Sequence, residues 1–268
     1  MRRIRTLGWL AMFLALTSCE GACGKKPAPA PAPKPPAPID RPVAKAEPPG
    51  VVEGSVRLAS PEAPAFTDEE MERKILDQMK QGPWPASCTP PKISDRRPLH
   101  VTPDGKLSGV VVAASNFKKA SAPRPPRVHD VVLRDCRLTP STIIALVGDK
   151  LRVTSEVKFP FMPAYGPPSK INTLIPGQTY EVELKTLGAS PLQCGFTAPC
   201  GRTDVIVLSH GYAALTDEQG NFRIDSFPTG EQVTVSAWHP LLNASETQLE
   251  VAPGETKSIE LVVTPLQR

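Results

Sequence analysis

Cys19 is the residue whose surroundings point most directly to a chemical reaction, the attachment of lipid to its thiol. It closes the run Leu-Thr-Ser-Cys at 16–19, which follows an apolar stretch over residues 7–16. That stretch is shorter than the roughly 20 residues that a membrane-spanning helix needs. The pattern predicts a signal peptide over residues 1–18 and a lipid anchor on Cys19; an ordinary signal peptide with an incidental cysteine is the alternative. Glu20, where inner-membrane retention signals carry aspartate, favours the outer membrane of a bacterial envelope.

A linker rich in proline and alanine follows the predicted anchor over residues 19–50. Such a segment has little apolar surface to bury, and it favours extended polyproline II backbone at about 3.1 Å per residue. We expect a disordered spacer that holds a folded head away from the membrane. A proline-rich ligand for a partner domain is the alternative.

Four further cysteines lie beyond the linker, at Cys88, Cys136, Cys194 and Cys200. An exported protein meets an oxidising compartment in which such cysteines pair. We expect the disulfides Cys88–Cys136 and Cys194–Cys200, worth roughly 4 and roughly 2 kcal/mol in the chain-entropy model because their loops differ in length. Cys23, within the linker, is left over and could form an intermolecular bridge.

Residues that could catalyse a reaction or hold a metal lack the necessary spacings. The four histidines have none of the short separations of metal sites; they are His100, His129, His210 and His239. The tripeptide Ser-His-Gly at 209–211 is not a nucleophile elbow, and Asp217 stands in a turn sequence. We therefore expect no catalytic residue, no metal, no cofactor and no enzyme activity. Hydrogen bonds beside turns are the expected role of His210 and His239, with a shared metal site as the alternative.

The charge of the chain argues against nucleic-acid binding. There are 31 Lys and Arg against 27 Asp and Glu, a formal charge of +4. Three of the arginines lie in the predicted signal peptide, so the rest of the chain is close to neutral and has no basic face for phosphate groups.

Beyond the linker, apolar and polar residues mostly alternate as they do in half-buried strands. Residues 51–58 show this alternation, and a capping box of Thr67 and Glu70 then opens a short helix that ends at Gly82. From residue 88 onwards, short strands are separated by glycine and proline turns. The pattern predicts an all-β fold of two Greek-key-type β-sandwiches with one short helix.

The last part of the chain carries a compact run of turn and core residues. Residues 215–224 read Leu-Thr-Asp-Glu-Gln-Gly-Asn-Phe-Arg-Ile, and Phe-Pro-Thr-Gly follows at 227–230. This run resembles the carboxypeptidase regulatory-like, or transthyretin-like, β-sandwich, and the resemblance implies that fold for residues 211–268. These 58 residues are few for a core of their own, so we expect the strand at 51–58 to join them. The domain between would then be an insertion.

The middle of the chain contains Cys88, a hairpin around 101–112, the run Asp-Cys-Arg-Leu-Thr-Pro at 135–140 and Cys194. Together these pieces resemble the cupredoxin-like domain that bacterial secreted proteins fuse to such modules, here over residues 88–210.

The copper ligands of that family are not present in this chain. The resemblance places one ligand His just after residue 156, but residues 155–161 contain no histidine. In the run Cys-x-x-His-x-x-Met that supplies the other ligands, Thr197 and Cys200 stand in place of the histidine and the methionine. The resemblance therefore implies a cupredoxin-like fold whose copper ligands are lost.

The loop over residues 159–168 could still bind a partner, because it is apolar, aromatic and stiffened by prolines. We expect either a cap over the sandwich or an exposed docking patch formed by Phe159, Phe161, Met162 and Tyr165.

These features predict a lipid-anchored envelope protein that is a non-catalytic binding or scaffold module. The expected partners are the membrane, through the anchor, and an envelope protein or polysaccharide. The alternative is copper binding or electron transfer by the cupredoxin-like domain with non-standard ligands.

Overall fold

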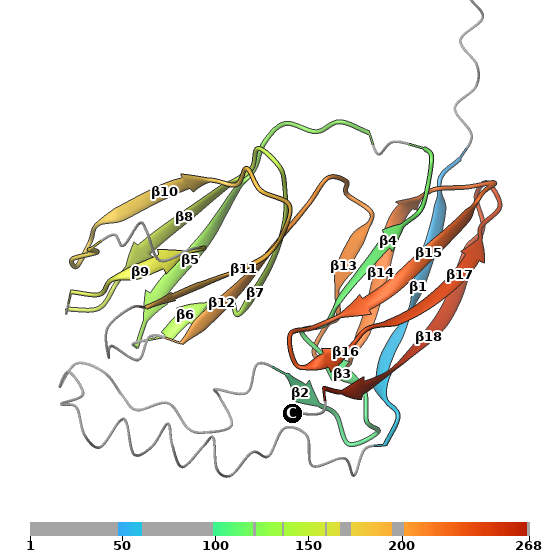
Figure 1. Cartoon of the computed structure of the whole chain (residues 1–268), viewed down its shortest axis with the longest axis horizontal. Coiled ribbons are helices and arrows are strands. Elements are labelled where there is room, and N and C mark those ends of the chain that lie inside the picture. Colours follow the sequence, from blue (N-terminus) through green and yellow to red (C-terminus); the bar gives the residue numbers. More distant parts are fainter. Residues whose placement is uncertain are drawn as a thin grey trace, which may run out of the picture. The chain divides into compact units, whose positions relative to one another are not determined.

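The computed structural model describes residues 48–60, 99–119, 122–135, 137–158, 160–166, 173–194 and 201–266 (Figure 1). All helix or strand elements within these ranges are strands, and they form several sheets, so the predicted all-β sandwich class is confirmed. Among the described residues, no helix is long and apolar enough to cross a membrane. Several predictions fall outside these ranges: the signal peptide, the linker up to residue 47, the helix at 67–82, and the residues Cys19, Cys88, Cys136, Phe159 and Cys200.

One sandwich, called here the terminal sandwich, is built from two four-stranded sheets whose strands come from both ends of the described chain. In sheet order, the first sheet contains β14 (Asn221–Phe227), β1 (Gly50–Leu58), β18 (Thr256–Pro265) and β16 (Leu242–Asn243). The second contains β13 (Ala213–Leu215), β4 (Val111–Ser115), β15 (Gln232–Trp238) and β17 (Ser245–Glu250). A short hairpin of β2 (His100–Val101) and β3 (Leu107–Ser108) contributes Leu107 to the same core.

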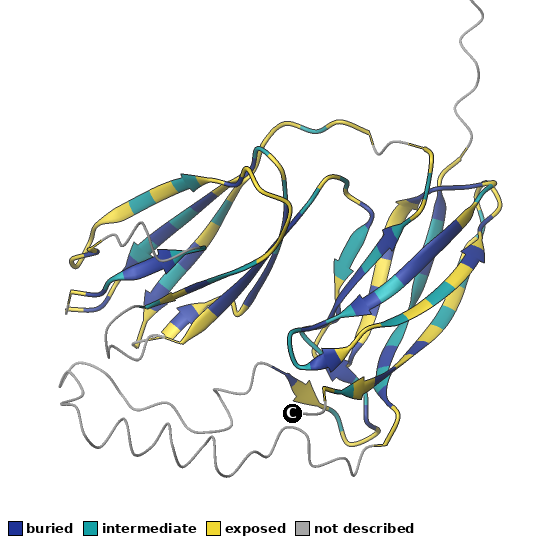
Figure 2. Cartoon of the chain, in the orientation of Figure 1, coloured by how far each residue is buried: buried dark blue, intermediate teal, exposed yellow. Residues whose placement is uncertain are grey.

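Strand β1 lies in the middle of the first sheet of the terminal sandwich. It pairs antiparallel with β14 and parallel with β18. Its inward side chains Val52, Val56 and Leu58 are at most 1% exposed and share one core with residues of both sheets (Figure 2). The strand at 51–58 therefore packs with the strands formed by the last 58 residues of the chain.

Strands β2, β3 and β4 also belong to the terminal sandwich, whereas the sequence predicts that they lie in a domain that begins at residue 88. β4 pairs with both β13 and β15, with Val112 opposite Ala214 and Ala237. The structure differs from the prediction because the alternation of apolar residues shows that a strand is half buried, but not which sheet it joins.

The strands between β4 and β13 form a second sandwich, called here the inserted sandwich. Its first sheet contains, in order, β10 (Thr179–Glu183), β8 (Lys150–Ser155), β5 (Val128–Arg134) and β6 (Arg137–Thr139). Its second contains β7 (Thr142–Leu146), β12 (Arg202–Leu208), β11 (Gly188–Cys194) and β9 (Pro163–Tyr165). Its core has its own set of buried residues, among them Val131, Leu151 and Val205.

The two ends of this insertion lie side by side within the terminal sandwich. The backbone N–H of Ala114 donates to the carbonyl oxygen of Tyr212 at 2.9 Å. The ring of Phe117 meets those of His210 and Tyr212 edge-on, with centroids 4.8 and 5.0 Å apart. These contacts hold together the two segments through which the chain leaves and re-enters the terminal sandwich.

The turn before β14 shows why the motif at 216–224 needs its residue types. The Asp217 carboxylate accepts the backbone N–H groups of Gln219 and Asn221 at 3.0 and 2.8 Å. Gly220 has φ +76°, and a Cβ there would lie 2.5 Å from the Cβ of Lys106. Asp217 thus stabilises a turn, and glycine is required both by the backbone angle and by the close approach.

Candidate functional site

Residues 160–166, the described part of the loop expected to be either a cap or a docking patch, contribute to the core of the inserted sandwich. Phe161 is 1% exposed and exchanges two backbone hydrogen bonds with Leu174, at 3.0 and 2.7 Å. Met162 is half-buried, and Tyr165 lies in β9, paired with Leu192. Phe161 is therefore unavailable to a partner, and the docking prediction is wrong for this residue because its ring fills the inserted sandwich instead of covering it.

Cys194 is the last residue of β11, opposite Pro163 of β9. Its sulfur is engaged in a disulfide. A disulfide sulfur is not a thiolate, so in this state Cys194 does not offer the ligand that a copper site of this type requires. The predicted partner, Cys200, lies outside the described residues, and the pairing stays a prediction.

Two of the histidines make hydrogen bonds beside turns. His239 is 3% exposed, and its Nδ1 accepts the backbone N–H of Leu241 at 3.1 Å. Burial lowers the pKa of His239 to about 4, so the ring is neutral at pH 7. In the same way, Nδ1 of His210 accepts the N–H of Tyr212 at 3.2 Å. The described residues contain no group of three His, Cys, Asp or Glu side chains placed to hold a metal ion.

Asp149 is a buried carboxylate, 1% exposed, at the turn between β7 and β8. Arg124 donates to both of its oxygens, at 2.8 and 2.6 Å, and Nε2 of His129 lies 2.8 Å from Oδ2. The backbone N–H groups of Arg127 and Leu146 donate at 2.9 and 2.8 Å. Burial alone would raise the pKa of Asp149, but these bonds outweigh it and hold that pKa far below its ordinary value.

Arg124 and Arg127 lie in the connection from β4 to β5. Their bonds to Asp149 therefore attach this connection to the inserted sandwich. Five contacts reach the carboxylate, two on Oδ1 and three on Oδ2, so both oxygens are fully bonded. A carboxylate that is buried and fully bonded has a structural role, because it has no acceptor capacity left for a ligand.

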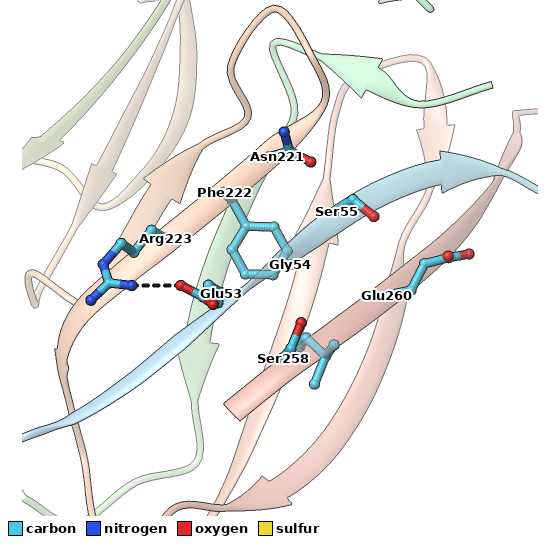
Figure 3. A pocket seen from close by; sticks show the side chains of 9 residues that line it. Glu53, Gly54, Ser55, Asn221, Phe222, Arg223, Ser258 and Glu260 are labelled. Atoms are coloured by element: carbon cyan, nitrogen blue, oxygen red, sulfur yellow. Dashed lines mark hydrogen bonds and ion pairs between the residues drawn. The ribbon is translucent and has the colours of Figure 1, made fainter. Parts of the chain in front are cut away.

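A polar groove lies on the first sheet of the terminal sandwich, on the face turned away from the core (Figure 3). Its volume is about 510 Å³. It is lined by three neighbouring strands, β14, β1 and β18, through the residues Glu53, Gly54, Ser55, Asn221, Phe222, Arg223, Ser258, Ile259 and Glu260.

The polar side chains of this groove stand in two rows that run across the three strands. Glu53 of β1 lies between Arg223 of β14 and Ser258 of β18. In the next row, Ser55 of β1 lies between Asn221 and Glu260. Because side chains alternate along a strand, both rows project from the same face of the sheet.

This groove could not be predicted from the sequence. Each strand shows the alternation from which outward residues can be read, as Glu53 and Ser55 do in β1. The groove exists because β18, some 200 residues away, pairs with β1 in parallel and in one register. A single sequence contains no signal for a register between such distant strands.

No protein-family model and no curated protein matches the chain. Parts of it are similar to solved cupredoxin structures. A purple cupredoxin from Nitrosopumilus maritimus is 15% identical, with 30% of this chain and 98% of that one covered and a TM-score of 0.26. Amicyanin from Paracoccus versutus is 16% identical, with 36% and 97% covered and a TM-score of 0.27. A copper-containing nitrite reductase from Thermus scotoductus is 17% identical, with 36% and 25% covered and a TM-score of 0.27. At such identities and TM-scores, the function of the chain has to be argued from its own residues.

Proposed function

We propose that this protein is a lipid-anchored binding module of a bacterial envelope and that it has no catalytic activity of its own. The structural observation that carries the proposal is the polar groove, which a continuous sheet holds in place on the terminal sandwich. The membrane anchor is proposed from the sequence around Cys19 alone.

The groove suits binding because a hydrogen-bonded sheet holds its backbone and some of its polar side chains have no hydrogen bond to the described residues. The hydroxyls of Ser55 and Ser258 make no hydrogen bond to any residue that the structure describes. By contrast, the Asp149 carboxylate, whose pKa is strongly lowered, already accepts hydrogen bonds from within the protein.

The alternative, copper binding or electron transfer, is less well supported by the residues. Cys194 would have to supply a thiolate, and its sulfur is engaged in a disulfide. We propose the pairing Cys194–Cys200 for that bond, which would occupy two of the positions that a ligand loop needs.

The anchor is tested by expressing the full chain, with its own leader, in a Gram-negative bacterium. Wild type and a Cys23→Ser control are expected in the membrane fraction, carrying labelled palmitate. Cys19→Ser is expected without label among the soluble envelope proteins. If Cys19→Ser stayed in the membrane as wild type does, the anchor would be refuted.

Binding at the groove is tested in intact cells with a photo-crosslinking amino acid at Ser258. The matched control carries it at Gln248, an exposed position of β17 on the other sheet. An adduct of defined mass at position 258 and none at position 248 supports the proposal. Equal labelling at both positions, or none at position 258, contradicts it.

A further inference from the structure

We propose that the free edge of β14 is an interface through which two copies of this chain associate, by antiparallel pairing of β14 with its counterpart. The inference goes beyond the proposed function, because it does not depend on what the groove binds. It is argued from the open backbone of β14, from the residues that a two-fold axis brings together and from the contrast with another edge strand.

β14 is the first strand of its sheet and pairs only with β1. In an antiparallel pair, alternate residues turn both of their backbone groups towards the partner strand. The N–H of Val56 donates to the carbonyl oxygen of Gly220 at 3.0 Å, so the even-numbered residues of β14 that pair with β1 face it in this way. The backbone groups of Arg223 and Asp225 therefore face away from β1, towards the free edge.

These outward backbone groups have no partner among the residues that the structure describes. The N–H and C=O groups of Arg223 and Asp225 make no hydrogen bond to another described strand or loop. A strand edge with free N–H and C=O groups is a template to which another strand can be added. The edge of β14 thus offers two donors and two acceptors to such a strand.

The sequence of β14 is complementary to itself around Ile224. When a second copy pairs antiparallel across a two-fold axis at Ile224, Arg223 of each copy lies opposite Asp225 of the other. Both residues turn their backbone groups outward, so each of the two pairs can exchange two backbone hydrogen bonds. Such an interface is isologous, because the same surface serves both copies.

The exposed side chains are complementary in the same register. Arg223 donates through Nη1 to Glu53, as Figure 3 shows, and through Nε to Oδ1 of Asp225 at 2.9 Å. Its Nη2 and the Oδ2 of Asp225 have no hydrogen bond to the described residues. Across the axis these two groups face each other, and the four charges of Arg223 and Asp225 in the two copies alternate in sign. Opposite charges directly across a strand pair stabilise it.

The edge strand β10 of the inserted sandwich lacks this complementarity. In the register that would pair all five of its residues with a second copy, the exposed Glu181 meets its own counterpart. Like charges directly opposite each other destabilise a strand pair, and charged residues commonly protect free edges. In the register centred on Ile224, β14 brings no like charges directly opposite each other, so its edge fits a second copy of the same strand.

Pairing of β14 joins two four-stranded sheets into one sheet of eight strands. Opposite residues of an antiparallel pair point to the same side, so the exposed faces of both copies lie on one side of the joined sheet. The β1 strands of the two copies are then about 14 Å apart, which is three strand spacings. The two polar grooves would therefore lie side by side on one face.

The test measures the mass of the full mature chain by sedimentation equilibrium in a density-matched detergent. Wild type is expected to form dimers at about 100 μM, because an interface of two short strands belongs to the small, transient class. Arg223→Glu places two carboxylates opposite each other, and Asp225→Arg places two guanidinium groups opposite each other. Each is expected to raise the dissociation constant of the dimer at least about tenfold.

The double variant Arg223→Glu/Asp225→Arg restores opposite charges across the axis and is expected to dimerise again. Gln248→Arg is the control, since it adds a charge at an exposed position of β17 on the other sheet, and it should dimerise as wild type does. Thermal unfolding of each variant shows that it is folded. Recovery in the double variant separates a lost interface from a damaged fold.

A second measurement places a photo-crosslinking amino acid at Asn221, an exposed position of β14, in intact cells. An adduct of twice the mass of the chain is expected, and it should be weaker in Arg223→Glu and restored in the double variant. An adduct of a different mass alone would show that the edge pairs with another protein, and the second copy would be refuted.

The proposal is also overturned if wild type sediments as a monomer, if the single variants dimerise as wild type does, or if the folded double variant stays monomeric. The crosslink at position 258 tests the groove separately, so the two proposals can fail independently.

Discussion

Asp149 shows how one buried charge can be stabilised by its surroundings. Its carboxylate is 1% exposed and accepts bonds from Arg124, His129 and two backbone N–H groups. The desolvation of such a group is costly unless each lone pair is matched, and here every partner comes from a different position along the chain. Nothing in the sequence around Arg124 reveals that its partner lies 25 residues further along the chain.

Asp149→Asn is expected to lower the free energy of unfolding by about 3 kcal/mol, measured by urea denaturation at pH 7. The new amide can accept on one side only, so either the N–H of Leu146 or that of Arg127 would face a second donor. Glu181→Gln, at an exposed ion pair with Lys150, is the control and should change little. Equal effects of the two substitutions would show that Asp149 has no special role.

The lowered pKa of Asp149 also sets a pH dependence. The unfolded carboxyl, with a pKa of about 3.9, binds a proton more readily than the folded one, so stability is gained above that pH and lost on acidification below it. We expect the stability of wild type to fall below about pH 4 and that of Asp149→Asn to fall less steeply. If the free energy of unfolding fell equally steeply below pH 4 for the two proteins, the lowered pKa of Asp149 would be contradicted.

His239 is expected to affect stability at milder pH. Its folded pKa of about 4 lies below the ordinary value of about 6.5, so the neutral ring stabilises the fold above pH 6.5, and this is lost as the pH falls towards 4. His239→Asn keeps an acceptor for the N–H of Leu241 but does not titrate. The free energy of unfolding, measured between pH 7 and pH 4, should fall more for wild type than for this variant; parallel curves would refute the assignment.

Phe161→Ala is expected to destabilise the protein by about 3–5 kcal/mol, because a ring that is 1% exposed leaves a cavity. Met162→Ala, at a half-buried neighbour, is the matched control and should cost less. Chemical denaturation measures both. A small effect of Phe161→Ala would indicate that the ring is exposed and would support the docking patch again.

At the scale of elements, β1 is the strand on which the groove and the terminal sandwich both depend. It lies between β14 and β18, and its outward residues Glu53 and Ser55 form the middle of both polar rows. Its alternation could be read from the sequence, and so could the turn at Asp217. The pairing partners could not, because the same alternation suits either neighbour in either direction.

Gly54→Ala tests the close pairing of β1 with β18. A Cβ at this position would lie 1.7 Å from the carbonyl oxygen of Ile259, so the two strands would have to separate. We expect a loss of at least about 2–3 kcal/mol in the free energy of unfolding. Ser55→Ala, whose side chain points away from the core, is the control and should be nearly neutral; a neutral Gly54→Ala would show that the strands can adjust.

At the scale of the whole molecule, the terminal sandwich is discontinuous in sequence. β1 and β4 come before the inserted sandwich, and β13 to β18 come after it. The chain leaves and returns at adjacent points, where Ala113 lies opposite Ala213 and Phe117 packs on His210. Each sandwich has its own set of core residues, as expected for units that could fold separately.

Removal of residues 120–209, replaced by a linker of about six Gly and Ser residues, is expected to leave the terminal sandwich folded. The short distance between Ala114 and Tyr212, with an N–H to oxygen contact of 2.9 Å, allows a short loop to close the gap. A single cooperative unfolding transition and dispersed amide NMR signals would support this. An unfolded product would show that the terminal sandwich needs the insertion.

The sequence by itself determined the all-β class, the turn at 216–220 and, as predictions, the lipid anchor and linker, because these depend on local patterns of apolar, turn and small residues. Only the tertiary structure decided that 99–115 belongs with the last strands, that Phe161 is core, and that Asp149 holds Arg124. The position of the groove is likewise decided only by the tertiary structure. Glu53, Asn221 and Ser258 become neighbours through sheet register, and register between distant strands is set by the packing of the whole sandwich.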